Sequence, residues 1–247
     1  MAYVDHHIMV KKQLNLTKNP GPVRRTWRFI RRWTMRLLLL LTVIFALWIV
    51  AYKYLTPWTT IYMMQENWRQ DGVQYEWVDM DQIAPAMQRA VVAAEDANYC
   101  LHWGLDSAAI QTALREGAVR GGSTISQQTV KNAFLWQGRN WVRKGLEAAL
   151  TPIADWAWGK ERMLELYLNI IEFDTGVFGI QAAAQHHFGV DAKDLNRVQA
   201  GRLAAVLPNP KAYSAVRPSA FMQKRARSII AGSDVIHRDG RAVCFQS

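Results

Sequence analysis

Two adjacent carboxylates, Glu95 and Asp96, stand where an apolar helical run ends. The run covers residues 90–94 and reads AVVAA, and one or two turns further on come Tyr99, His102 and Gly104. A carboxylate at the edge of an apolar wall has its pKa raised by desolvation, which suits it to take or give a proton near neutral pH. A lone Glu-Asp pair is also typical of a solvated helix end. The chemical interpretation therefore depends on the residues further along the chain.

A second stretch, GGSTISQQTVKN at residues 121–132, combines glycines with a predicted helix start. Thr124 and Gln127 have the spacing of a capping box. The free amides of a helix N-terminus bind anions, and glycines before it let the backbone approach a ligand closely. Thr124, Gln127, Gln128 and Lys131 share one face at helical spacing, with Ser123 just before it. This polar face suits a sugar-phosphate, and its alternative is a capped, solvated helix.

A third stretch carries cations and one further carboxylate. Arg139, Arg143 and Lys144 follow Lys131 within fourteen positions, and Glu147 lies one helical turn beyond Arg143. Taken alone, the pairs with Glu147 are ordinary surface ion pairs, which contribute about 0.3–0.5 kcal/mol each. Taken together, clustered cations suit a reaction whose leaving group is a pyrophosphate.

The net charge of +10 is distributed unevenly along the 247 residues. Residues 1–36 hold nine Lys/Arg and one acid, whereas the remaining residues hold 21 Lys/Arg and 19 acids. The part of the chain that should fold is therefore close to neutral. Because nucleic-acid binding needs a basic face on the domain itself, we expect no nucleic-acid partner.

A sixteen-residue run without charge, LLLLLTVIFALWIVAY at residues 37–52, predicts a membrane anchor. A spanning helix needs about 20 apolar residues, and the flanking Arg36 and Lys53 can extend the run by snorkelling. A buried core helix and a cleaved signal peptide are the alternatives. The run is hydrophobic all round, and no small-residue cleavage site is evident. Positive charge precedes it, so we expect a cytoplasmic N-terminus with the domain outside.

The rest of the chain shows mainly helical periodicity, so the predicted fold class is all-α. We expect extended structure at residues 59–62 and 75–78, and then helices over residues 81–96, 107–114, 124–135, 140–153, 160–173, 180–188, 194–207 and 219–231, the last one stopping at Gly232. The predicted organisation is a basic tail (1–32), an anchor (33–55), one domain (56–232) and a C-terminal tail (233–247). Two cysteines, Cys100 and Cys244, fit no metal motif, and the sequence leaves open whether they pair.

Four linked motifs resemble the peptidoglycan glycosyltransferases of family 51. They are Glu95-Asp96-x-x-Tyr99-x-x-His102-x-Gly104, Gly121-Gly122-Ser123-Thr124-Ile125-Ser126-Gln127-Gln128, Arg143-Lys144-x-x-Glu147 and Lys160-x-x-Met163-Leu164-Glu165-x-Tyr167-Leu168-Asn169. The resemblance covers roughly residues 60–230, and residues 179–189 and 207–210 also match. Tyr99 stands where the family usually has Phe, and Ser126 where it usually has Thr. With no room for a transpeptidase domain, the chain resembles the monofunctional members rather than the bifunctional penicillin-binding proteins.

The resemblance implies a lysozyme-like, two-lobed helical domain that joins lipid II units into glycan strands. It implies that Glu95 is the general base and that Glu147 is the second catalytic carboxylate, which helps to stabilise the pyrophosphate. The residues that match substrate-binding positions are Ser123, Thr124, Gln127, Gln128, Lys131, Arg143 and Lys144, with Arg139 as a similar candidate on less motif support. Glu165 and Asn169 match a structural hydrogen-bonding pair.

The implied partners are lipid II, the nascent glycan strand, the membrane and cell-wall synthesis or division proteins. The implied location is the inner membrane, with one membrane pass and a periplasmic catalytic domain. We expect no obligatory cofactor, and a divalent cation such as Mg²⁺ at Glu147 is left open. The connector around Trp58, Ile61, Tyr62, Met63 and Met64 is a candidate for contact with lipid. A lysozyme-like hydrolase and a membrane-anchored scaffold are the competing functions.

Overall fold

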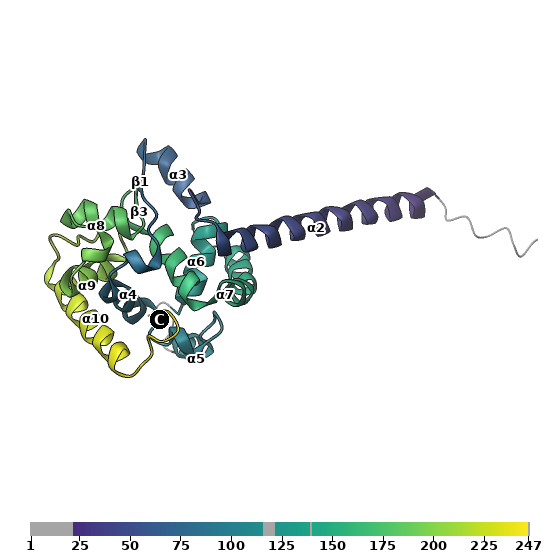
Figure 1. Cartoon of the computed structure of the whole chain (residues 1–247). Coiled ribbons are helices and arrows are strands. Elements are labelled where there is room, and N and C mark those ends of the chain that lie inside the picture. Colours follow the sequence, from purple (N-terminus) through teal and green to yellow (C-terminus); the bar gives the residue numbers. More distant parts are fainter. Residues whose placement is uncertain (1–21, 116–121, 139, 247) are drawn as a thin grey trace, which may run out of the picture. The chain divides into compact units, whose positions relative to one another are not determined.

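The computed structural model describes residues 22–115, 122–138 and 140–246, and the chain divides into two compact units, one ending at Val50 and one beginning at Ala51. The predicted Arg139 and Gly121 lie outside the described residues. Helix α2 (Pro22–Tyr54) accounts for all that is described of the first unit. The second unit is mostly helical, as the periodicity predicts, and its elements are labelled in Figure 1.

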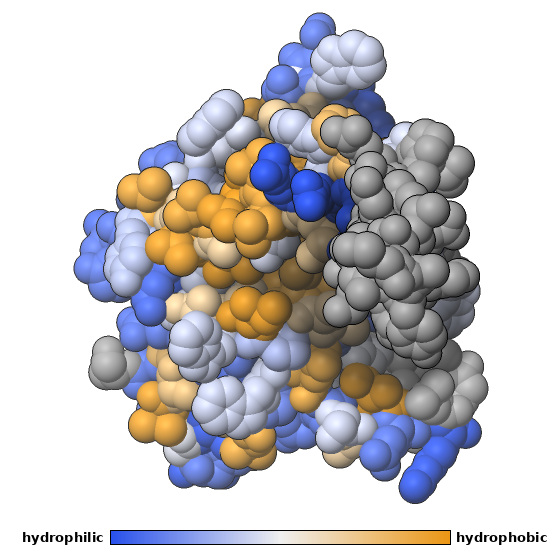
Figure 2. All heavy atoms as spheres, turned by 90° about the vertical axis from the view of Figure 1, so that its right-hand side faces the viewer, coloured by the Kyte–Doolittle hydropathy of each residue, from blue (hydrophilic) through white to orange (hydrophobic). Residues whose placement is uncertain are grey.

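Helix α2 is long and apolar enough over Thr26–Tyr54 to cross a membrane. Its leucines at positions 37–41 are all more than half exposed, so this apolar surface is not used in a protein core. The hydroxyls of Thr34 and Thr42 donate to the backbone carbonyls of Ile30 and Leu38, which leaves no unsatisfied donor from these side chains in lipid. The exposed leucines and the paired threonine hydroxyls fit the predicted anchor. Figure 2 colours one face of the molecule by hydropathy and shows apolar side chains gathered there.

The second unit begins with helix α3 (Ile61–Gln70) and a small three-stranded sheet. Strand β1 (Gln74–Tyr75) pairs in parallel with β3 (Val177–Phe178), which pairs antiparallel with β2 (Glu172–Asp174). The prediction of extended structure at residues 59–62 is wrong beyond Thr60. The Thr60 side chain accepts a hydrogen bond from the Met63 amide and starts α3 there. Strand β1 falls within the predicted extended segment only at Tyr75.

The remaining helices follow the predicted order. They are η1 (Met80–Gln82), α4 (Pro85–Glu95), η2 (Tyr99–Leu101), α5 (Ser107–Arg115), α6 (Ile125–Phe134), α7 (Trp141–Ile170), α8 (Ile180–Phe188), η3 (Ala192–Asp194), α9 (Arg197–Val206) and α10 (Ala220–Arg238). The predicted first and seventh helices begin later than expected. Pro85 opens α4 because its missing amide costs nothing at the first helical position, and the Asn196 side chain caps α9.

Helices α4, α9 and α10 pack on one another, and α6 packs on α7 (Figure 1). The prediction that the last helix stops at Gly232 is wrong, since α10 continues to Arg238. Gly232 is instead a packing position: a methyl group added there would lie 3.3 Å from Ala93 Cβ on α4. Gly201 plays the same part on α9, where an added Cβ would lie 2.6 Å from Ile230 Cγ1 on α10.

Helix α7 contains two segments. The second begins at Lys160 as predicted, but the prediction that it runs to Phe173 is wrong, since it ends at Ile170 and Glu172–Asp174 form strand β2. Gly159 adopts φ +73°, a conformation that glycine takes at no steric cost and that breaks the helical path. In the second segment Glu165 accepts a hydrogen bond from the Met80 amide, and Asn169 exchanges two hydrogen bonds with the backbone of Val78. These buried contacts hold residues 78–80 against the core, so Glu165 and Asn169 are the structural pair that the resemblance implies.

The C-terminal segment packs against the helical core. Ile236 and Phe245 are buried, and Phe245 lies beside the Tyr99 ring. Cys100 and Cys244 form a disulfide across a sequence separation of 144 residues, which answers the question that the sequence leaves open. The bridge joins η2, directly after Glu95-Asp96, to the end of the chain.

Candidate active site

Glu95 is the last residue of α4, and its carboxylate is held by a hydrogen bond from α6. Gln128 Nε2 donates to Glu95 Oε2 at 2.9 Å, and the Tyr167 hydroxyl donates to Gln128 Oε1 at 3.3 Å. The buried tyrosine on α7 therefore orients the amide that orients the carboxylate. The other carboxylate oxygen, Glu95 Oε1, is buried and accepts no hydrogen bond from the described residues, and Arg225 Nη2 lies 3.7 Å from it.

The surroundings of Glu95 favour its protonated form. Burial raises the pKa of Glu95, and Asp96 acts in the same direction, whereas the Gln128 hydrogen bond and the charges of Arg225 and Lys131 oppose the rise. The side chain is still 14% exposed. A carboxylate with a raised pKa that solvent or substrate can reach is suited to general base chemistry near neutral pH.

Asp96 has a different task from its neighbour. Its Oδ2 accepts from the Ile125 amide at the start of α6, and its Oδ1 lies 2.9 Å from His102 Nε2. A carboxylate at a helix N-terminus satisfies a free amide and interacts well with the helix dipole. Of the two adjacent acids, Asp96 thus holds the start of α6 in place, while the assignment of Glu95 as the base stays a prediction.

The N-terminus of α6 is built as the sequence predicts. Thr124 and Gln127 form the capping box, and the Thr124 hydroxyl also donates to the Gly104 carbonyl at 2.5 Å. Gly104 has φ +81°, and an added Cβ would lie 2.9 Å from Thr151 Cγ2. Both cap side chains are buried and engaged within the protein. Their role in substrate binding stays a prediction, while their structural role is evident.

Glu147, on α7, is the centre of a charged cluster beside this cap. Its buried carboxylate pairs with Arg143 Nη1 at 2.5 Å and with the Lys144 ammonium, and Gln127 Nε2 donates to it at 3.4 Å. Lys144 Nζ also donates to Ser123 Oγ at 2.9 Å. The structure therefore joins five of the predicted residues, Ser123, Gln127, Arg143, Lys144 and Glu147, into one hydrogen-bonded group.

Lys131 interacts electrostatically with both carboxylates, Glu95 and Glu147. Burial lowers its pKa, Arg143 and Lys144 lower it further, and both Glu147 and Glu95 raise it. Together with Gln128 it lines a pocket of about 290 Å³. Asn132 and Gln137 line it from the same part of the chain. The other lining side chains come from distant segments: Tyr62, Tyr167, Ile171, Glu172 and residues 207–211. The pocket thus brings two predicted binding residues together with the predicted 207–210 segment.

The sequence analysis does not identify some residues of the site. Arg225, on α10, places Nη2 3.7 Å from Glu95 Oε1, and Lys211 pairs with Glu66 and Glu172 on the pocket wall. Neither cation lies within a motif, and each reaches its partner across more than 30 residues of sequence. Tyr167 falls inside a quoted motif, but its spacing alone gives no sign of its bond to Gln128.

Comparison with known proteins agrees with this geometry. Residues 62–233 match the family model described as Transglycosylase. A biosynthetic peptidoglycan transglycosylase of Jannaschia sp. (strain CCS1) is 55% identical over 237 residues, 96% of this chain and 99% of that protein. A protein of the same name from Caulobacter vibrioides is 42% identical over 88% of this chain and 98% of its own. One from Escherichia coli (strain ATCC 8739) is 44% identical over 82% of this chain and 88% of its own.

The fold and the site define a helical, lysozyme-like enzyme domain of the glycosyl-transfer class. The family model covers more than half of the chain, and the relatives match the chain over most of their length. The chain therefore belongs to the transglycosylase family.

Proposed function

We propose that this protein polymerises lipid II into peptidoglycan glycan strands by inverting glycosyl transfer, with release of undecaprenyl pyrophosphate. The observation that carries the proposal is the arrangement along α6. In its first turn the adjacent Gln127 and Gln128 contact the Glu147 cluster and the buried Glu95 respectively, and Lys131, one turn further on, interacts with both carboxylates. The relatives' shared name, peptidoglycan transglycosylase, supports the same reaction.

In the proposed reaction the 4-hydroxyl of the acceptor sugar attacks the anomeric carbon of the donor. A bond forms between that oxygen and carbon, and the bond from the carbon to the pyrophosphate oxygen breaks. Glu95, ionised at the start, takes the hydroxyl proton. The electron pair and the negative charge leave with the pyrophosphate, towards Lys131, Arg143 and Lys144, where fixed cations stabilise developing charge. Arg139 remains a predicted contributor outside the described residues.

In this proposal Glu147 positions two cations and takes no part in the proton transfer. Its two oxygens are taken by Arg143 and Lys144, so it fixes both cations where a polyanion would meet them. A Mg²⁺ ion is bound through several oxygen ligands, including waters. The described side chains around Glu147 offer one carboxylate already paired with two cations, which does not fit a metal held by the protein alone. The divalent cation that the sequence left open is therefore not part of the proposal, and no step passes through it.

The proposed location is the inner membrane with the catalytic unit on the periplasmic side. The apolar helix α2 and the basic residues before it support a single pass with this orientation. The disulfide Cys100–Cys244 supports an oxidising compartment for the catalytic unit. An anchor at the membrane keeps the site close to a lipid-linked donor.

Polymerisation of labelled lipid II by the purified full chain tests the function. We expect glycan strands from the unchanged chain and a loss of about 10²–10⁴-fold in rate for Glu95→Gln, since the amide cannot take the proton. Glu161→Gln, which alters an exposed carboxylate on α7, is the matched control and should keep full activity. Soluble fragments released from sacculi instead of strands would indicate a hydrolase. Full activity of Glu95→Gln would refute the assigned base, and no strands from any form would favour a scaffold.

A further inference from the structure

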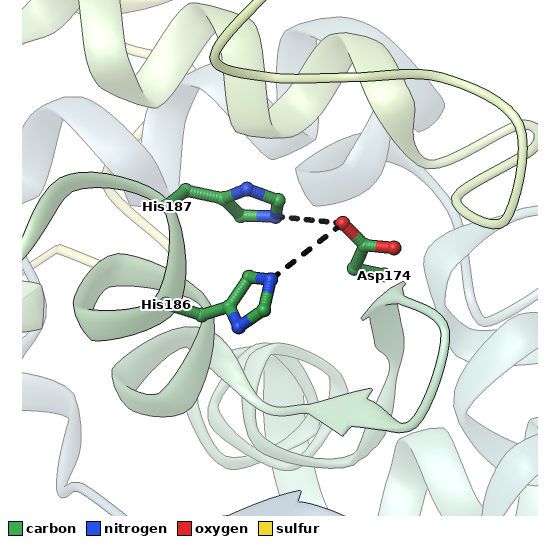
Figure 3. Close-up of side chains that lie close together, drawn as sticks. All are labelled: Asp174, His186 and His187. Atoms are coloured by element: carbon green, nitrogen blue, oxygen red, sulfur yellow. Dashed lines mark ion pairs between the residues drawn. The ribbon is translucent and has the colours of Figure 1, made fainter. Parts of the chain in front are cut away.

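A cluster of three metal-ligating side chains lies apart from the residues assigned to glycosyl transfer. Asp174 ends strand β2, and His186 and His187 lie in the last turn of α8 (Figure 3). His187 Nε2 lies 3.6 Å from Asp174 Oδ2, and His186 Nε2 lies 3.9 Å from the same oxygen. One ligand atom from each of the three residues falls within 4.8 Å of the others.

These distances are too long for hydrogen bonds and close to those between the ligands of one small cation. Zinc binds nitrogen and oxygen ligands at about 2.0–2.2 Å, so two ligands of a tetrahedral site are about 3.3 Å apart. The observed 3.6 and 3.9 Å require only small side-chain rotations to reach that spacing. The two imidazole rings lie nearly perpendicular, with centroids 4.9 Å apart, so they do not stack on each other and block the space.

The buried nitrogen of His187 is the strongest sign of a missing partner. The His187 side chain is only 4% exposed, and its Nε2 has no hydrogen-bond partner among the described residues. A buried polar atom left unpaired costs about 1–3 kcal/mol, so such atoms usually meet a water or an ion. Figure 3 shows this nitrogen pointing towards the Asp174 carboxylate. An ion placed between them would satisfy both.

The residues are also oriented as metal ligands usually are. Asp174 Oδ1 accepts from the Thr175 amide at 2.7 Å, which turns Oδ2 towards the histidines. His186 and Asp174 are about one third exposed, so an ion can enter from solvent.

We propose that Asp174, His186 and His187 bind a divalent transition-metal ion of the zinc class, with water at the remaining position. Two imidazoles and one carboxylate suit zinc rather than Mg²⁺ or Ca²⁺, which prefer oxygen ligands. The ion fastens the β2–β3 hairpin to α8. Glu172, two residues before Asp174 on β2, lines the pocket that contains Lys131, so the ion steadies one wall of that pocket.

Metal binding by the full chain in detergent, purified without a histidine tag, tests this site. Asp5, His6 and His7 form a second Asp-His-His group near the N-terminus, so the parent protein for the test is His6→Ala/His7→Ala. We expect this parent to bind one Zn²⁺ per chain in competition with a chromophoric chelator. We also expect Co²⁺ to give the visible absorption of a four-coordinate ion and Zn²⁺ to raise the Tm.

In that parent, His187→Ala and Asp174→Asn should each weaken Zn²⁺ binding by at least about tenfold and remove the rise in Tm. His237→Ala removes an exposed histidine elsewhere on the second unit and should bind as the parent does. His186→Ala, at a more exposed position, replaces His187→Ala if the latter does not fold. Failure of the parent to bind micromolar Zn²⁺, or equal binding by the parent and all three site variants, would overturn the proposal.

Discussion

At the residue scale, two neighbouring carboxylates with the same chemistry acquire different roles from their partners. Asp96 accepts from a helix-start amide and faces His102, so its charge is used to hold α6 in place. Glu95 receives a single side-chain hydrogen bond, from Gln128, in a buried setting that raises its pKa. The difference lies in the direction in which each side chain leaves the end of α4, and it makes Glu95 the group that can exchange a proton.

The Gln128 hydrogen bond lowers the pKa of Glu95 and so opposes the effect of burial. A base works only when ionised, so activity falls as the pH drops through the Glu95 pKa. Replacing Gln128 by Leu removes a stabilising donor from the carboxylate. We therefore predict that Gln128→Leu moves the acidic limb of the pH profile of kcat/KM to higher pH.

Gln223→Leu, at an exposed position on α10, is the control for this prediction and should leave the limb where it is. Gln128 also lines the pocket, and a loss of substrate contacts would lower the rate equally at every pH. A uniform decrease without displacement of the limb would contradict the role assigned to the hydrogen bond.

At the element scale, α6 organises the site because it contacts both charged groups. Its capping box fixes its first turn, its Gln127 reaches Glu147 on α7, and its Gln128 reaches Glu95 on α4. Successive residues of a helix point about 100° apart, so adjacent glutamines can serve two different neighbours. The contacts of α6 with α4 and α7 thus set the separation between Glu95, the proposed base, and the cations around Glu147.

The helices that support α4 depend on glycines at their crossing points. We predict that Gly201→Ala destabilises the protein by about 1–3 kcal/mol, since the added methyl group meets Ile230 at 2.6 Å and the Ala226 carbonyl at 3.2 Å. Gly145→Ala is the matched control, because it lies in α7 with nothing within 4 Å of the added Cβ. It should be neutral or stabilise by up to about 1 kcal/mol. Thermal unfolding in detergent measures both, and equal Tm values for the two variants would refute the packing role of Gly201.

At the scale of the whole molecule, the disulfide ties the last residues of the chain to the segment just after Glu95. A bridge across 144 residues restricts the unfolded chain strongly, and bridges over loops of this order contribute about 2–5 kcal/mol. We predict that Cys100→Ser/Cys244→Ser lowers the Tm and makes residues 239–246 more sensitive to protease. The reduced unchanged chain should behave in the same way, and an unaltered Tm in both would show that the bridge adds no stability.

The catalytic unit also presents apolar side chains that could contact lipid. Trp58 is 84% exposed and Trp156 76% exposed, and Met64 is about half exposed. Met63, which the sequence groups with this connector, is instead buried in the core, so it is excluded from such a contact. Exposed apolar groups of this size usually mark an interaction surface.

We predict that Trp58→Gln/Met64→Gln/Trp156→Gln reduces the binding of residues 51–247 to liposomes in a flotation assay several-fold, because the apolar surface transferred to lipid becomes smaller. Val198→Gln/Val235→Gln changes two other exposed apolar positions and serves as the control. Unchanged flotation of the triple variant would exclude these side chains from the membrane contact.

The sequence by itself determined the features that depend on neighbours close along the chain. Helical periodicity predicted the fold class, Thr124 and Gln127 predicted the capping box, and the run at residues 37–52 predicted the anchor. The linked motifs pointed to Glu95, Glu147 and the cations. These signals are local, because capping, helical faces and apolar runs involve residues a few positions apart.

Only the tertiary structure decided the features that join distant segments. It placed Arg225 and Tyr167 around Glu95, gave Asp96 a structural task, paired Cys100 with Cys244 and carried α10 through Gly232. It also brought Asp174 to the two histidines of α8. A glycine within a helix reads as a stop signal until the neighbouring helix that needs the space is known. Contacts of this kind are set by the packing of whole helices, which no short stretch of sequence encodes.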